Sequence, residues 1–150
     1  MKFIFISNFD CFPGSKVDDE NSYLATTFGD GSIIVYNILD GNVAYNLQSG
    51  SNTALPVTNL RFRPSTSSST KHVLVTVNAS GVIQHWHMTS GKCIHTIYEK
   101  DNSIYALDYN CNATNFITAG LDHTIRYTLQ LYFTHILSYI WLYGCMCIMR

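Results

Sequence analysis

Two segments decide the fold: LATTFGDGSIIVYNILDGNVAYNL at 24–47 and LVTVNASGVIQHWHMTSGKCIHTI at 74–97 align at an offset of fifty residues without a gap. Tyr36 of the first segment aligns with Trp86 of the second. The positions identical in both segments are Leu24/Leu74, Thr26/Thr76, Gly31/Gly81, Ile33/Ile83 and Gly41/Gly91. An ungapped repeat of this length predicts one structural unit that is used twice.

Each segment has the pattern of three short strands joined by tight turns. Glycines 31 and 41 mark the turns of the first segment, and glycines 81 and 91 those of the second, because glycine adopts positive φ without a steric cost. Between the turns, β-branched and aromatic residues dominate and helical periodicity is absent. Cys93 aligns with Val43 and is predicted to be a small buried hydrophobe. The pattern predicts an all-β fold.

A further strand precedes each segment, which makes four strands per unit. Residues 57–62 form this strand in the second unit, where Pro64 ends it. In the first unit we expect it at 3–12, with 15–21 as a polar connector. A third unit begins at 104–109 and continues at 116–119 and 121–126, and its match to the others stops after Tyr127. The predicted units are a first blade at 1–50, a second at 51–99 and a partial third at 100–128.

The sequence resembles the blades of WD-repeat (WD40) β-propellers over roughly residues 3–127. The motifs that carry the resemblance are FRPS at 62–65, DGSIIVYN at 30–37, SGVIQHWH at 80–87 and DHTIR at 122–126. The resemblance implies a partial β-propeller of four-stranded antiparallel WD40-type blades. It also implies a non-enzymatic scaffold or adaptor that binds other proteins and needs no cofactor.

The chain departs from the family pattern in three ways. His87 rather than aspartate follows Trp86, and no Gly-His dipeptide precedes any unit. In the family that histidine and the turn aspartate share a hydrogen-bonded network, so the resemblance implies blades that are less firmly held together. Two and a half blades also cannot close a ring that takes about four to eight. We therefore expect a truncated propeller or a fragment of a larger one, which needs further blades or partner chains to close.

The resemblance also implies where protein partners bind. In the family these contacts come from the turns between the second and third strands and from the loops that enter each blade. The corresponding residues here are Asp30, Asn52, Ser80, Asp101, Asn102, Asp122 and His123.

The C-terminal region, 129–150, is uncharged up to its last residue, Arg150. As a helix, its twenty-one uncharged residues would span roughly 31 Å, about the thickness of the hydrocarbon layer of a bilayer. A tail-anchored, membrane-associated protein with a cytosolic blade-like region is therefore the alternative function. Polar residues spread through the first half favour an aberrant terminus instead, and a packed strand or helix is the third interpretation.

The remaining features exclude several functions. Nine Lys and Arg oppose ten Asp and Glu without a basic run, which argues against nucleic acid binding. Five cysteines without a C-x-x-C pair predict a reducing compartment, cytoplasmic or nuclear. His85 and His87 share a strand face, but no third metal ligand is spaced to join them. No catalytic, cofactor-binding or metal-binding residue is predicted.

Overall fold

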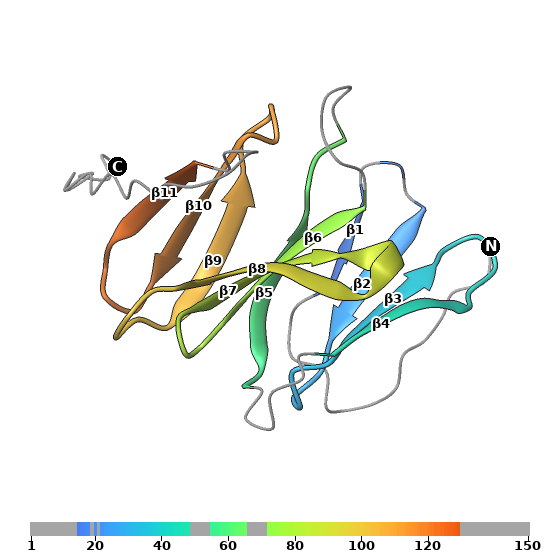
Figure 1. Ribbon diagram of the computed structural model, residues 1–150, viewed down its shortest axis with the longest axis horizontal. Coiled ribbons are helices and arrows are strands. Elements are labelled where there is room, and N and C mark those ends of the chain that lie inside the picture. Colours follow the sequence, from blue (N-terminus) through green and yellow to red (C-terminus); the bar gives the residue numbers. More distant parts are fainter. Residues whose placement is uncertain (1–14, 19, 21, 49–54, 66–71, 130–150) are drawn as a thin grey trace, which may run out of the picture.

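The computed structural model describes residues 15–18, 20, 22–48, 55–65 and 72–129. In this part of the chain, strands form three antiparallel sheets that follow one another along the sequence (Figure 1). Sheet 1 contains β1 (Ser15–Val17), β2 (Tyr23–Thr27), β3 (Ile33–Asn37) and β4 (Val43–Leu47). Sheet 2 contains β5 (Val57–Phe62), β6 (Val73–Asn78), β7 (Val82–His87) and β8 (Lys92–Tyr98), with a 3-10 turn, η1 (Met88–Ser90), before β8. Sheet 3 contains β9 (Ile104–Tyr109), β10 (Asn115–Gly120) and β11 (Ile125–Leu129).

Each sheet is a meander in which every strand pairs with the one before it. The aligned segments also share their register: Leu24 lies opposite Tyr36 in sheet 1, and Leu74 lies opposite Trp86 in sheet 2. Because side chains alternate between the two faces of a strand, equal registers place equivalent residues on equivalent faces. The prediction of four-stranded antiparallel blades is confirmed for sheets 1 and 2.

The first strand of sheet 1 differs from the prediction. Residues 15–17, expected in a connector, form β1, which pairs with β2 from Ser15 opposite Thr26 to Val17 opposite Leu24. The prediction failed because apolar runs were taken as the strand signal, whereas β1 is a short strand that begins with Ser15 and Lys16. The strand predicted at 3–12 lies outside the described residues.

The prediction for Cys93 was also wrong. Its position does match that of Val43, but both side chains are exposed. They lie on β8 and β4, the outermost strands of their sheets, whose outer edges no other described strand covers. Position in the sheet, rather than the apolar character of the residue, decides burial here.

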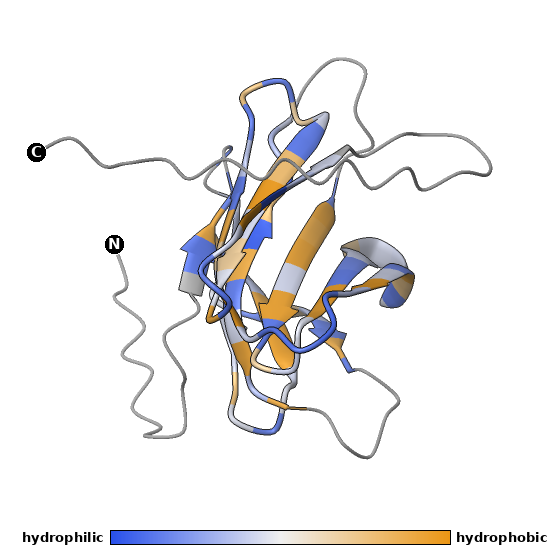
Figure 2. Ribbon diagram, turned by 90° about the vertical axis from the view of Figure 1, so that its left-hand side faces the viewer, coloured by the Kyte–Doolittle hydropathy of each residue, from blue (hydrophilic) through white to orange (hydrophobic). Residues whose placement is uncertain are grey.

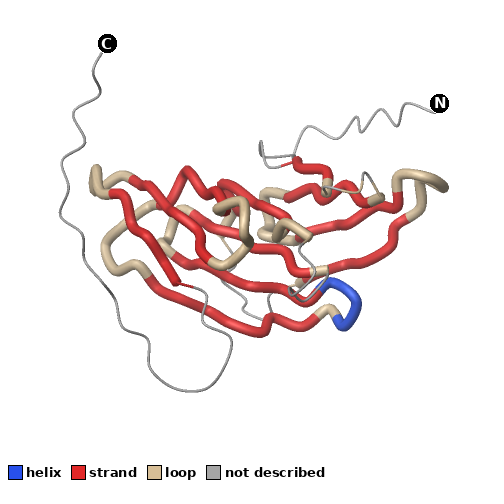
Figure 3. Tube along the Cα trace, turned by 90° about the horizontal axis from the view of Figure 1, so that it is seen from above, coloured by secondary structure: helices blue, strands red, loops and turns tan. Residues whose placement is uncertain are grey.

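The apolar cores lie between successive sheets. Between sheets 1 and 2, Val35 and Leu47 belong to the same buried cluster as Leu74 and Trp86. A second cluster joins sheets 2 and 3 and includes Val75, Ile83, Leu107 and Phe116. Figure 3 shows the strands of the three sheets side by side, with loops at their ends. The three sheets form an open array that does not close into a ring.

At its C-terminal end the described chain reaches Leu129, which pairs with Asn115. β11 therefore includes one residue that the sequence assigned to the tail. The rest of the predicted tail, from 130 onward, lies outside the described residues. In the part of the chain that the structure describes, no helix is long and apolar enough to cross a membrane.

Candidate functional site

The tight turns between the second and third strands of the three sheets lie on one edge of the array (Figure 1). In each turn a short polar side chain binds the backbone ahead of it. Asp30 accepts hydrogen bonds from the amide and hydroxyl of Ser32, at 2.9 and 2.6 Å. In sheet 3, Asp122 accepts bonds in the same way from the amide and hydroxyl of Thr124, at 3.1 and 2.9 Å. Such bonds hold the exposed turns in one conformation.

The second turn uses a different acceptor. Asn78 accepts bonds from the amides of Ser80 and Val82, at 3.0 and 2.9 Å, and from the hydroxyl of Ser80 at 2.9 Å. Ser80, which stands where the other turns have aspartate, is thus a donor here and not an acceptor. Side-chain hydrogen bonds thus lock the backbone of all three turns in place, although the sequences of the turns differ.

The backbone of the three turns is also equivalent. Gly31 and Gly81 have φ values of +79° and +75°, and His123 occupies the same place in sheet 3 with φ +59°. This left-handed conformation costs roughly 1–2 kcal/mol for a residue other than glycine. Sheet 3 therefore keeps the turn geometry with an exposed imidazole at its tip.

The two turn aspartates differ in their electrostatics. The bonds from Ser32 lower the pKa of Asp30. The hydrogen bond from Arg126 is the largest of several effects that lower the pKa of Asp122 to about 2. Asp122 also forms an ion pair with Arg126, whereas Asp30 lies in an exposed turn.

A buried carboxylate, Glu99, lies behind the turn of sheet 3. It follows β8 and is only 7% exposed. One carboxylate oxygen accepts a bond from the hydroxyl of Thr118 at 2.5 Å, and the other accepts bonds from Asn102 Nδ2 at 2.7 Å and Arg126 Nη1 at 3.2 Å. A buried charge is tolerated only when it is paired in this way. Glu99 therefore links the end of sheet 2 to β10 and β11 of sheet 3.

Asn102 completes this network. Its Oδ1 atom accepts a bond from the backbone amide of Asp122 at 3.2 Å. Gly120 allows the close approach, because a Cβ atom at that position would lie 2.5 Å from Asn102 Nδ2. The family's histidine is absent, and the chain instead uses Glu99, Asn102 and Arg126 to connect the loop that enters sheet 3 with the turn aspartate.

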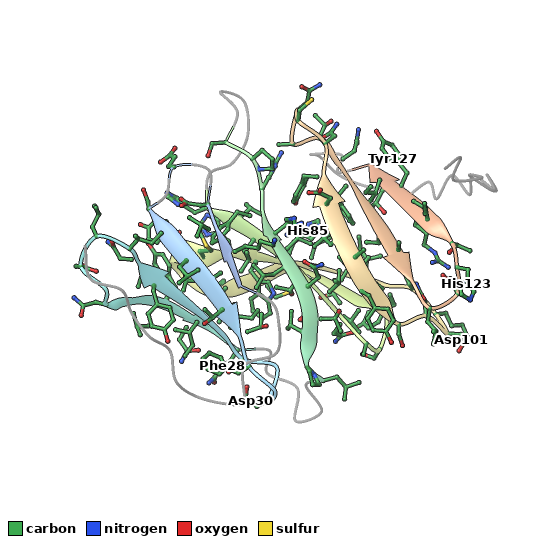
Figure 4. The ribbon with its side chains drawn as sticks, turned by 180° about the vertical axis from the view of Figure 1, so that it is seen from behind. Phe28, Asp30, His85, Asp101, His123 and Tyr127 are labelled. Atoms are coloured by element: carbon green, nitrogen blue, oxygen red, sulfur yellow. The ribbon has the colours of Figure 1, made fainter. Side chains whose placement is uncertain are left out.

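The predicted contact residues separate into two groups. The exposed ones are Asp30, Ser80, Asp101 and His123. Figure 4 shows Asp101 and His123 close together at one end of the array, whereas Asp30 lies at the other end. Asn102 is buried, at 4% exposure, and Asp122 is partly buried and paired with Arg126. Asn52 lies outside the described residues.

Sequence reasoning missed Glu99 and Arg126. Arg126 was part of the DHTIR motif, and it lies opposite Thr118, on the face of sheet 3 that contains Phe116 and packs against sheet 2. A charged residue at an inward position of a strand requires a partner, and that requirement could have directed the search to a nearby acid. The acid itself could not be found by spacing, because it lies in a loop between two sheets.

The two histidines considered as metal ligands serve different purposes. His85 is buried and its ring packs edge-on against Phe116, with ring centroids 5.4 Å apart. His87 shares a hydrogen bond with the hydroxyl of Ser90 at 3.0 Å. Among the described residues, no group of three His, Cys, Asp or Glu side chains is arranged to hold a metal ion.

A buried side-chain hydrogen bond joins β6 and β7 of sheet 2. The indole Nε1 of Trp86 donates to Thr76 Oγ1 at 3.1 Å, and both side chains are buried. The equivalent threonine of sheet 3 is Thr118, which donates to Glu99. Short antiparallel meanders of up to four strands that pack face to face in succession have the architecture of β-propeller blades.

Comparison with known proteins supports the assignment of these sheets as propeller blades. Residues 91–127 match the family model described as WD domain, G-beta repeat. The fold is similar to the crystal structure of the Cps50 (Swd1) β-propeller domain of Myceliophteria thermophila, with a TM-score of 0.69 and 13% sequence identity. The match covers 83% of this chain and 37% of that chain, so this chain spans well under two thirds of it. No curated protein matches the sequence. The chain therefore has the fold of β-propeller blades, and its residues 91–127 match a WD40 repeat.

Proposed function

We propose that the chain is a non-enzymatic scaffold that binds other proteins through the turn edge, defined as Asp30, Ser80, Asp101 and His123. The observation that carries the proposal is that three locked turns, one from each sheet, expose polar side chains on the same edge. Turns that are rigid before binding lose little conformational entropy when a partner binds.

The charge of the turn edge fits a polar protein partner. Asp30 and Asp101 carry negative charge, and His123 adds a group that both donates and accepts hydrogen bonds. The edge has no cluster of basic residues, which a nucleic acid would require. Asn102 and Asp122 support this edge from behind, since their side chains bind within the chain.

A location in the cytoplasm or nucleus fits this function. Cys93 and Cys111 are exposed free thiols, which are typical of a reducing compartment. The alternative, a tail-anchored membrane protein, depends on residues 130–150 and therefore lies outside the described residues.

Affinity capture from cell extract tests the function. The bait is the full chain, compared with a variant in which Asp30, Ser80, Asp101 and His123 are replaced by alanine. We expect the variant to lose specific partners that the wild-type chain retains. The matched control replaces Leu39, Asp40 and Thr89, exposed residues of the turns on the opposite edge, and should retain them. Partners that are lost equally with both variants, or with neither, would contradict the proposal.

A further inference from the structure

The packing of the sheets repeats in one direction. The face of sheet 1 that contains Val35 packs against the face of sheet 2 that contains Leu74 and Trp86. The other face of sheet 2, which contains Val75 and Ile83, packs against sheet 3. Each sheet thus covers the preceding one with one face and offers its second face to the next.

The second face of sheet 3 packs against no other sheet in the described part of the chain. The register of the strands shows which residues lie on this face. The pair Ile117 and Tyr127 occupies the place that Val75 and His85 have in sheet 2. The pair Ala119 and Ile125 occupies the place of Val77 and Ile83. We name the residues Ile117, Ala119, Ile125 and Tyr127 the open face of sheet 3.

The exposure of this face differs sharply from that of its counterpart in sheet 2. Ile117, Ile125 and Tyr127 are 44%, 56% and 46% exposed. The equivalent residues Val75, Ile83 and His85 are 0%, 1% and 4% exposed, because sheet 3 covers them. Figure 2 views this side of the molecule and shows hydrophobic stretches along its strands. Exposed apolar residues grouped on one face mark an interaction surface.

The complementary surface lies at the other end of the array. We name the residues Val17, Leu24, Ile34 and Tyr36 of sheet 1 the open face of sheet 1. Leu24 and Tyr36 occupy the places of Leu74 and Trp86 in sheet 2. Leu74 and Trp86 are almost fully buried, whereas Leu24 and Tyr36 are only partly buried and Val17 is 46% exposed.

We propose that the open face of sheet 3 binds the open face of sheet 1 of a second copy of the chain, head to tail. The contact continues the interface that already joins sheets 1 and 2 and sheets 2 and 3. When the contact forms twice between two copies, the three described sheets of each copy join into a closed ring of six. Six falls within the range of about four to eight blades in which propellers close.

Charge supports a second copy as the occupant. Within the chain, Arg61 of β5 pairs with Asp108 of β9 at 3.2 Å, so the equivalent positions of neighbouring sheets meet across the interface. Lys16 occupies this position in sheet 1. Lys16 lies opposite Ala25, and Arg61 lies opposite Val75, which is the residue of sheet 2 that aligns with Ala25. Asp108 would therefore meet an oppositely charged Lys16 in the second copy.

The mass of the full chain in solution tests the proposal. Size-exclusion chromatography with light scattering, over a wide range of concentrations, should give twice the mass of one chain. Ile125→Lys and Tyr127→Glu place a charge in the open face of sheet 3 and should each give single copies. Leu39→Lys, at an exposed turn residue away from both faces, should leave the dimer intact.

Mixing two variants separates the head-to-tail contact from a symmetric one. The Ile125→Lys chain keeps its open face of sheet 1, and a Val17→Glu chain keeps its open face of sheet 3. Each variant alone should be a single copy, and their mixture should form a one-to-one complex through one intact contact. Circular dichroism verifies that each variant is folded.

Three results would overturn the proposal. One is a wild-type chain that stays a single copy at every concentration, which would mean that another segment or another protein covers the open face. The second is a dimer that Ile125→Lys and Tyr127→Glu leave unchanged. The third is folded variants that do not associate on mixing.

Discussion

The carboxylate of Glu99 and the hydroxyl of Thr118 lie 2.5 Å apart, and this bond ties the end of sheet 2 to the middle strand of sheet 3. Arg126 bridges the same carboxylate to the turn aspartate, Asp122. In WD40 repeats, a histidine shares a hydrogen-bonded network with the turn aspartate. Here a buried acid and an arginine connect to that aspartate instead.

Removing Glu99 should be costly. In Glu99→Ala, Thr118, Asn102 and Arg126 all lose a partner in a largely buried site, so we expect the free energy of unfolding to fall by about 3 kcal/mol. Urea denaturation monitored by circular dichroism measures the change. Lys100→Ala, at the exposed neighbouring residue, should change stability by less than about 0.5 kcal/mol. Equal effects of the two substitutions would show that the network contributes nothing.

The bond between Trp86 and Thr76 should contribute separately. Trp86→Phe keeps an aromatic ring in the core but removes the Nε1 donor, and Thr76→Val removes the acceptor. A double-mutant cycle should give a coupling energy of about 1 kcal/mol, the usual net value of one hydrogen bond. A coupling energy near zero would mean that Trp86 acts only by filling space.

His85 should make stability depend on pH. Burial is the main effect that lowers its pKa to about 4, with the nearby His95 and Arg63 adding to it. In the unfolded chain the pKa is about 6.5, so the unfolded state binds more protons between these values. Stability should therefore be full above pH ~6.5 and should fall by up to ~3 kcal/mol as the pH decreases toward ~4.

Substituting His85 tests the origin of this pH dependence. His85→Phe should flatten the curve of unfolding free energy against pH over that interval. A slope that survives in His85→Phe would assign the titration to another group.

The sequence predicted those parts of the fold that depend on local chemistry. Glycines at the turns and β-branched strands were enough to predict the meanders, and the fifty-residue offset was enough to align them. The short strand β1 was missed because a strand of this kind is held by its pairing with β2 and not by its own residues. Glu99 was missed for a similar reason: its partners Thr118 and Arg126 come from a different sheet.

The turns at Gly81 and His123 should respond oppositely to substitution, although their backbones are alike. His123→Gly removes the cost of the left-handed conformation and should raise the free energy of unfolding by about 1 kcal/mol. Gly81→Ala should lower it by more than that, because the new Cβ would lie 2.7 Å from the carbonyl oxygen of Asn102, besides having to adopt φ +75°. Thermal denaturation of both variants measures the two changes. If His123→Gly were destabilising, the imidazole would have to form contacts in the turn that outweigh the backbone cost.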